Sequence, residues 1–495
     1  MKNFWRTNST WLIVFLVLLV LAVFGFSSMG QTSFVRTTLS GLTLGALYFM
    51  VASGLTLVFG LMDVLNFAHG TTFMVGAYMG WQFFTNPTFL FGIAPLILAF
   101  LAGINAGTPL QFWITRLDIP EKFQGWVKNG LSLVGILVGV LSVWGVDILG
   151  LAQTALVAIT ADANPLAEIS AQIPLSEFWY RPFLALISGL LLAIAMAGPG
   201  DKTKIVSRET SWRIWITVGV LLVITFVSVL IRESAPQAVL LMNADLRFVL
   251  ALLVGILTGV GLGAAMEITL IRPLYVRPMY QVLVTLGIAY VFKELIQLLW
   301  QPLAYQMSRP PLFSQPGKAE NMLAWFQTHN TTVDIWGVTF PSYRLFIILL
   351  GVLMLIGLAI LMKYTRFGMI IRAGVQDRQM VEALGINVRK VFTTVFALGA
   401  GLAALGGIGA APFIPVQPNM GDAFQLQGFI VVVIGGMGSY GGAAIGAILL
   451  GMARAFGDYL ALKFSLSPAI SEASTVIIMA IVLIVRPSGL FGKKE

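Results

Sequence analysis

Apolar runs long enough to cross a lipid bilayer recur from one end of this chain to the other, which limits it to a membrane-embedded fold. Of its residues, 58% are hydrophobic and 10% are charged, whereas soluble domains carry about 25% charged residues. A spanning helix needs about 20 apolar residues, and on that length we predict an all-α polytopic membrane protein. The predicted spans lie near 11–29, 37–60, 64–84, 89–104, 130–150, 182–198, 214–231, 246–270, 281–300, 344–362, 391–411, 424–436, 441–457 and 470–486.

The lysines and arginines gather in a few of the connections between these spans. If consecutive spans alternate in direction, the basic segments 202–213, 272–277 and 363–390 lie on the same side as both termini. Because positively charged loops stay in the cytoplasm, we predict cytoplasmic termini and external connections at 151–181 and 301–343. These loops, in contact with membrane lipid, also account for the formal net charge of +9, so we expect no nucleic-acid partner.

The first apolar run follows Lys2 and Arg6, as in a secretory signal peptide. The run is long, and residues 24–30 offer no small-x-small cleavage site. We therefore expect a retained first helix.

Several chemistries are excluded by residue type. The chain has no cysteine and two histidines, His69 and His329, so disulfides and thiolate chemistry are excluded and a multi-histidine metal site is not expected. No GxxxxGK[ST] phosphate loop is present, so the chain does not hydrolyse ATP by itself. We expect no cofactor and no enzymatic activity, because an enzyme needs several polar catalytic groups at one depth.

The segment 363–390 is more than a basic tether. In residues 373–384 (AGVQDRQMVEAL), helix-forming residues mix with charged ones, and Gly385 follows where a helix C-terminal cap is expected. The pattern predicts one short amphipathic cytoplasmic helix. Such a helix either docks a partner protein or lies flat at the lipid interface, and the sequence alone leaves both open.

Two glycine-containing breaks interrupt apolar stretches in the two halves of the chain. Residues 54–70 include Asp63, Asn66 and His69, and residues 435–442 (GGMGSYGG) form the second break. Taken alone, each is better explained by a tight turn, but paired breaks are typical of a transport site and suggest an inverted repeat. We predict a narrow, mostly apolar translocation path at Asn66, Phe67, His69, Thr71, Met437 and Ser439.

Four GxxxG spacings predict close packing between helices, since small residues let backbones approach in lipid. They occur at Gly41/Gly45, Gly255/Gly259, Gly259/Gly263 and Gly442/Gly446.

Several motifs resemble, in order, the conserved blocks of the branched-chain amino acid ABC permeases, most closely the H-type subunit. They are SGLTLGALY (40–48), GLTLVFG (54–60), NFAHG (66–70), RPLY (272–275), RFGM (366–369), ALGIN (383–387), VIGGMGS (433–439) and RPSGLFG (486–492). The resemblance covers roughly 36–86 and 246–492, and it implies a multi-helix permease of an ABC importer in the bacterial inner membrane.

The resemblance also implies partners. These are two ATP-binding subunits, a second related permease subunit and an extracytoplasmic substrate-binding protein. The segment around 383–387 corresponds to the loop that contacts the ATPase in that family. We therefore predict coupling positions at Arg372, Asp377, Glu382, Ala383, Gly385 and Asn387.

The chain departs from the family pattern in two ways. Thr71 stands where an acidic residue usually follows NFAHG. Residues 87–245 form an insertion with about four extra apolar spans. We therefore predict N-terminal permease helices at 1–86, an inserted helical region at 87–245 and a C-terminal permease core at 246–495.

Two alternatives stay open for the function. Permeases of the same family carry urea, short amides or other hydrophobic amino acids. An ion-coupled secondary transporter would need an intramembrane carboxylate, for which Asp63, Glu267 and Glu294 are poor candidates. Glu267 is expected to be balanced by Arg272, and the neighbouring Lys293 and Glu294 point about 100° apart on a helix.

Overall fold

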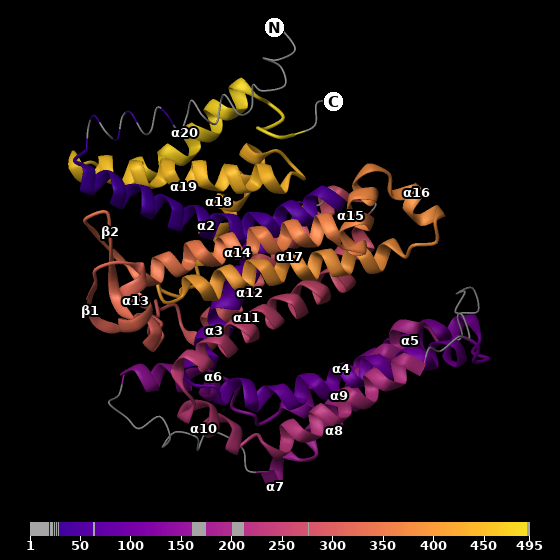
Figure 1. Cartoon of the computed structure of the whole chain (residues 1–495). Helices are drawn as coiled ribbons and strands as arrows, with labels where there is room; N and C mark the ends of the chain where they lie inside the picture. The colour runs from indigo at the N-terminus through magenta and orange to yellow at the C-terminus, as the bar shows by residue number, and fades with distance from the viewer. Residues whose placement is uncertain are drawn as a thin grey trace. The chain divides into compact units, whose positions relative to one another are not determined.

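The computed structural model describes residues 29–62, 65–160, 175–199, 212–275 and 277–492, with a few single positions before residue 29. By internal contacts the chain divides into two compact units, Met1–Trp81 with Ala244–Glu495 and, between these segments, Gln82–Asn243. Both units are built of helices, as predicted, with one small sheet in the first (Figure 1). The interpretation of 87–245 as an insertion into a permease core stays a prediction.

The first unit contains most of the helices. In chain order its elements are α2 (Gln31–Met62), α3 (His69–Thr85, which continues into the second unit), α11 (Ala244–Met266), the π-helix η2 (Glu267–Ile271), η3 (Arg272–Leu274), α12 (Pro278–Trp300), η4 (Pro311–Phe313), β1 (Gln315–Ala319), α13 (Met322–Thr328), β2 (Asn330–Ile335), β3 (Val338–Pro341), α14 (Ser342–Tyr364), α15 (Arg366–Gln376), α16 (Arg378–Ala383), α17 (Val388–Ala410), α18 (Met420–Gly435), α19 (Tyr440–Lys463) and α20 (Ala469–Val485).

The second unit is a helical bundle. Its elements are α4 (Thr88–Ile114), α5 (Glu121–Val143), α6 (Ile148–Thr160), α7 (Leu175–Phe178), α8 (Arg181–Ala197), α9 (Trp212–Leu230) and α10 (Ser234–Leu241). Close backbone contact joins α4 to α8, since a Cβ added at Gly103 would lie 2.1 Å from Leu186 O. A side chain at this glycine would push the two helices apart.

The described helices account for most of the predicted spans. Nine of them are long and apolar enough to cross a membrane, or ten if α9 and α10, bent by 79°, form one span. The first predicted span, 11–29, lies largely outside the described residues. The spans predicted at 64–84, 424–436 and 470–486 correspond to helices α3, α18 and α20, of 17, 16 and 17 residues. Helix α3 is short because a turn occupies residues 65–68.

Small residues bring helix backbones together in the first unit, as the GxxxG spacings predicted. A Cβ added at Gly259 would lie 2.4 Å from Ala404 Cβ, which fixes the approach of α11 to α17. One added at Gly451 of α19 would lie 2.3 Å from Gly41 O of α2. Helices α2 and α17 are the most enclosed spans, with 78% and 72% of their apolar stretches buried.

The connection 301–343, predicted as a loop, instead contains a three-stranded sheet with β1 parallel and β3 antiparallel to β2. Strands β2 and β3 are joined by Trp336 and Gly337, whose positive φ values of 51° and 79° suit a two-residue hairpin turn. Lys318 of β1 pairs with Asp334 of β2 and holds the pKa of that carboxyl below its ordinary value. The sheet and the α15–α16 segment lie at opposite ends of α14 (Figure 1).

The contact between α11 and α17 can be tested with a matched pair of glycines. We expect Gly259→Val to destabilise the protein by about 1–3 kcal/mol, because the added side chain must displace Ala404. Gly261→Val, in the same helix, is the control, since a Cβ there meets nothing within 4 Å. Thermal unfolding in detergent measures both, and equal midpoints for the two variants would contradict the packing.

Candidate functional site

The NFAHG segment forms a buried turn that leads into α3. Asn66 Oδ1 accepts a hydrogen bond from Ala68 N at 3.0 Å, which closes the turn. Asn66 and His69 are fully buried, and His69 Nε2 lies 3.2 Å from Val51 O of α2. Thr71 is also buried, with 5% of its surface exposed. Asp63, included in this break by the sequence, lies outside the described residues.

Gln425 of α18 fastens this turn. Its Oε1 accepts a hydrogen bond from Gly70 N, and its Nε2 donates to Asn66 O at 3.2 Å. Gly70 cannot carry a side chain, because a Cβ there would lie 2.2 Å from Gly421 O. The backbone of the 65–68 turn and of the first residues of α3 is therefore bound by a distant side chain that was not predicted from the sequence.

Phe67 connects the same turn to α12 and α18. Its backbone N donates to Thr285 Oγ1 of α12 at 3.2 Å. Its ring lies 4.9 Å, centroid to centroid, from that of Phe429 in α18. The turn thus lies against two helices that begin more than 200 residues later.

A cavity of about 220 Å³ opens beside Phe67, between α12 and α18. The residues that line it are Phe67, Leu286, Ala289, Tyr290, Lys293, Asp422, Gln425, Leu426 and Phe429. Lys293 Nζ lies 2.9 Å from Asp422 Oδ2, so this mostly apolar cavity carries one ion pair. The sequence places Lys293 next to Glu294, and nothing in it indicates that Asp422 lies opposite.

Met437 and Ser439 belong to a separate turn beyond the C-terminal end of α18. The turn is tight: Gly436 and Gly438 have φ values of 93° and 80°, and Ser439 Oγ caps α19 by accepting from Gly442 N at 3.1 Å. The helix rise from Phe429 to Gly435, the last residue of α18, is about 9 Å at 1.5 Å per residue. The structure therefore groups Asn66, Phe67, His69 and Thr71, and places Met437 and Ser439 apart from them.

The motif at 486–492 completes this end of α18. Leu490 N donates to Ile434 O at 2.8 Å, and Phe491 N donates to Gly435 O at 3.0 Å. The last carbonyls of a helix have no partner within it, and these two obtain theirs from the distant motif.

The segment predicted as one helix at 373–384 is two helices, which corrects that prediction. Asp377 is extended, with φ of −153°, and its side chain accepts from Met380 N at 3.0 Å to cap α16. An aspartate at this position stops α15 and starts a new helix. Gly385 has a φ of 79°, and the expectation that it ends the helix is confirmed.

Most of the predicted coupling residues lie at or just beyond the ends of these helices, and Arg372 lies within α15. Arg372 donates to Met362 O, which holds α15 against the end of α14. Asn387 caps α17 by accepting from Lys390 N at 3.2 Å. Glu382 and Ala383 are exposed, and the adjacent Leu384 exposes 71% of its surface. The segment therefore presents apolar and charged side chains together between α14 and α17.

Glu267 is balanced by Arg272, as predicted. Two arginine nitrogens donate to the buried carboxylate at 3.1 and 2.8 Å, and Thr393 Oγ1 of α17 donates to it at 2.7 Å. Tyr275 O–H donates to it as well, and burial next to this carboxylate raises the pKa of Tyr275. A carboxylate with this many donors is poorly placed to bind a coupling ion, which disfavours the secondary-transporter alternative.

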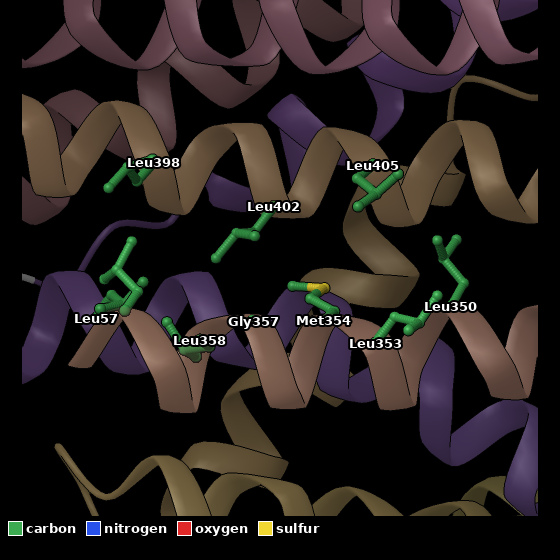
Figure 2. A pocket seen from close by; sticks show the side chains of 10 residues that line it. Leu57, Leu350, Leu353, Met354, Gly357, Leu358, Leu398, Leu402 and Leu405 are labelled. Carbon is green, nitrogen blue, oxygen red and sulfur yellow. The ribbon is translucent and has the colours of Figure 1, made fainter. Parts of the chain in front are cut away.

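A second cavity, of about 320 Å³, contrasts with the first. Figure 2 shows Leu398, Leu402 and Leu405 of α17 across from residues of α14. The lining consists of Leu57, Leu350, Leu353, Met354, Gly357, Leu358, Leu361, Leu398, Leu402 and Leu405. This apolar lining could accommodate a lipid acyl chain or a rearranged apolar side chain, but it has no polar side chain to recognise a charged ligand.

Comparison with known proteins gives one family. Its profile, described as "Branched-chain amino acid transport system / permease component", matches residues 216–486, more than half of the chain. The high-affinity branched-chain amino acid transport system permease protein LivH of Escherichia coli is 32% identical over 181 residues, which are 36% of this chain and 52% of that protein. BraD of Pseudomonas aeruginosa, with the same description, is 30% identical over 161 residues, 32% of this chain and 50% of that protein. The chain thus matches about half the length of these relatives, and no solved structure matches it.

The role of Gln425 can be tested by removing its amide. We expect Gln425→Leu to destabilise the protein by about 1–3 kcal/mol, because Gly70 N–H would be left unpaired in the interior. Gln427→Leu, at a half-buried position of the same helix, is the control. Thermal unfolding in detergent compares the two, and a Gln425→Leu variant as stable as its control would contradict the anchoring role.

Proposed function

Because this chain belongs to the family of branched-chain amino acid transport permeases, we propose that it is the membrane-spanning subunit of an ABC importer for branched-chain or related hydrophobic amino acids. The match over more than half of the chain is the observation that carries this proposal. The importer would lie in a bacterial inner membrane, with both termini cytoplasmic by the distribution of lysine and arginine.

The proposed partners are two ATP-binding subunits, a second related permease subunit and an extracytoplasmic binding protein. The exposed α15–α16 segment supports a docking site for an ATP-binding subunit, through Glu382, Ala383, Leu384 and Gly385. Since α17 begins right after it and Thr393 contacts Glu267, a movement of the segment would reach η2, which directly follows α11. The Gln82–Asn243 unit would be an addition to this permease core.

Urea or a short amide is the alternative cargo within the same family. Neither molecule carries a separated positive and negative charge, so neither makes use of the Lys293–Asp422 pair. The pair therefore favours an amino acid.

The docking proposal is tested in the complete complex, with ATP-binding subunits and binding protein, in lipid nanodiscs. We expect Leu384→Glu to reduce substrate-stimulated ATP hydrolysis more than tenfold, as loss of a central interface residue costs about 2 kcal/mol or more. Gly385→Val should act likewise, because a side chain is strained at its φ of 79°. Leu462→Glu, at a position on α19 that is also highly exposed (82%), is the control. Full stimulation in the Leu384→Glu complex would contradict docking at α16.

The translocation path is tested with single cysteines, since the natural chain has none. Without nucleotide, Met437→Cys should react quickly with a small water-soluble thiol reagent and Thr71→Cys slowly, because the two positions are 58% and 5% exposed. During ATP hydrolysis with substrate present, the Thr71→Cys variant should react faster. If it stays unreactive in every state while cysteines on neighbouring helices react, the path runs elsewhere.

A further inference from the structure

We propose that the cavity between α12 and α18 binds the zwitterionic head group of a free amino acid. Lys293 would contact the α-carboxylate, and Asp422 would contact the α-ammonium group. The apolar side chain of the amino acid would lie against Leu286, Leu426 and Phe429. This inference rests on the transport function proposed above and gives it a substrate site.

The charges in the cavity match those of a free amino acid. Lys293 Nζ and Asp422 Oδ2 lie 2.9 Å apart, so they form a short dipole at the cavity wall. The carboxylate and ammonium of an amino acid are carried by one carbon atom and form a dipole of similar length. When the two dipoles lie antiparallel, each charge meets its opposite, and the Lys293–Asp422 pair need not break.

The position of the pair in the fold argues for contact with water or substrate rather than lipid. Lys293 lies within α12, about 10 Å of helix rise before Trp300. Ionisable side chains at such positions are costly in hydrocarbon and usually face a polar pathway. The Asp422 side chain remains 64% exposed despite its ion pair, so lipid on this face would meet a bare carboxylate.

The rest of the cavity provides an apolar surface of amino-acid size. Its volume is about 220 Å³, and most of its lining is leucine, phenylalanine, tyrosine and alanine. Gln425, which binds the backbone of the 65–68 turn, is part of the same wall. Binding here would therefore touch the turn that leads to Thr71. The leucine-lined cavity of Figure 2 offers no charge for such a ligand.

The test uses photo-leucine, a leucine analogue with a diazirine in its side chain, on the complete complex in nanodiscs. After irradiation, we expect mass spectrometry to find the label in peptides that contain 286–293 and 422–429. An excess of leucine should reduce this labelling about tenfold, since leucine makes the same contacts with Lys293 and Asp422 and competes for the cavity. Leucinamide, which lacks the carboxylate, and the corresponding keto acid, which lacks the ammonium, should reduce it much less.

Substitutions of Lys293 and Asp422 test the contribution of each charge to binding. Lys293→Met and Asp422→Asn should each lower labelling about tenfold, the cost of one charge-assisted hydrogen bond. Lys318→Met, which removes the ion pair with Asp334 in the small sheet, is the control and should label normally. The competition series uses the unaltered chain, so it decides the matter even if a variant fails to assemble.

Two outcomes would overturn the assignment: labelling at other peptides only, or competition by leucinamide as strong as by leucine. Uptake of radioactive leucine by proteoliposomes containing the same complex separates this inference from the proposed function. If leucine is taken up but the cavity is not labelled, only the zwitterion site fails. If neither leucine nor any other branched-chain amino acid is taken up, the proposed function fails with it.

Discussion

Lipid tails compete with every apolar side chain for the surface of a helix, so helices in a bilayer associate by close contact rather than by escape from water. The first unit meets this constraint with glycine and alanine where backbones touch. Gly259 faces Ala404 between α11 and α17, and Gly41 faces Gly451 between α2 and α19. The same rule governs the site, where Gly70 lies directly against Gly421 and brings the NFAHG turn within reach of Gln425.

Much of the helical framework could be predicted from apolar length alone, because a bilayer imposes one length on every span. The small sheet at 315–341 could not, since its strands are only 4 to 6 residues long and β1 and β2 show little alternation. The division between α15 and α16 depends on the single side chain of Asp377, which competes with the backbone for a hydrogen bond. Mixed helix-forming residues around it gave no sign of that competition.

The candidate site was predictable in part. Polar residues inside an apolar stretch indicated Asn66 and His69, because such residues must find partners within the protein. The His69 ring lies against Val51 O, and the Asn66 side chain accepts from the nearby Ala68 N, whereas the backbone O of Asn66 is bound by Gln425, more than 350 residues away in the sequence. The Lys293–Asp422 ion pair could not be predicted from the sequence for the same reason, since its two residues lie on different helices. A single sequence shows which groups need partners but not which helices meet.

The junction between residues 434–435 and 490–491 has a consequence for biosynthesis. Helix α18 is synthesised well before the 486–492 motif, whose N–H groups donate to its last carbonyls. Until Leu490 and Phe491 have left the ribosome, the carbonyls of Ile434 and Gly435 lack these hydrogen-bond donors. The end of α18 therefore cannot reach its final form before that point. Chains cut short before residue 490 would contain every described helix but leave the last carbonyls of α18 unpaired, which gives quality-control proteases a defined feature to recognise.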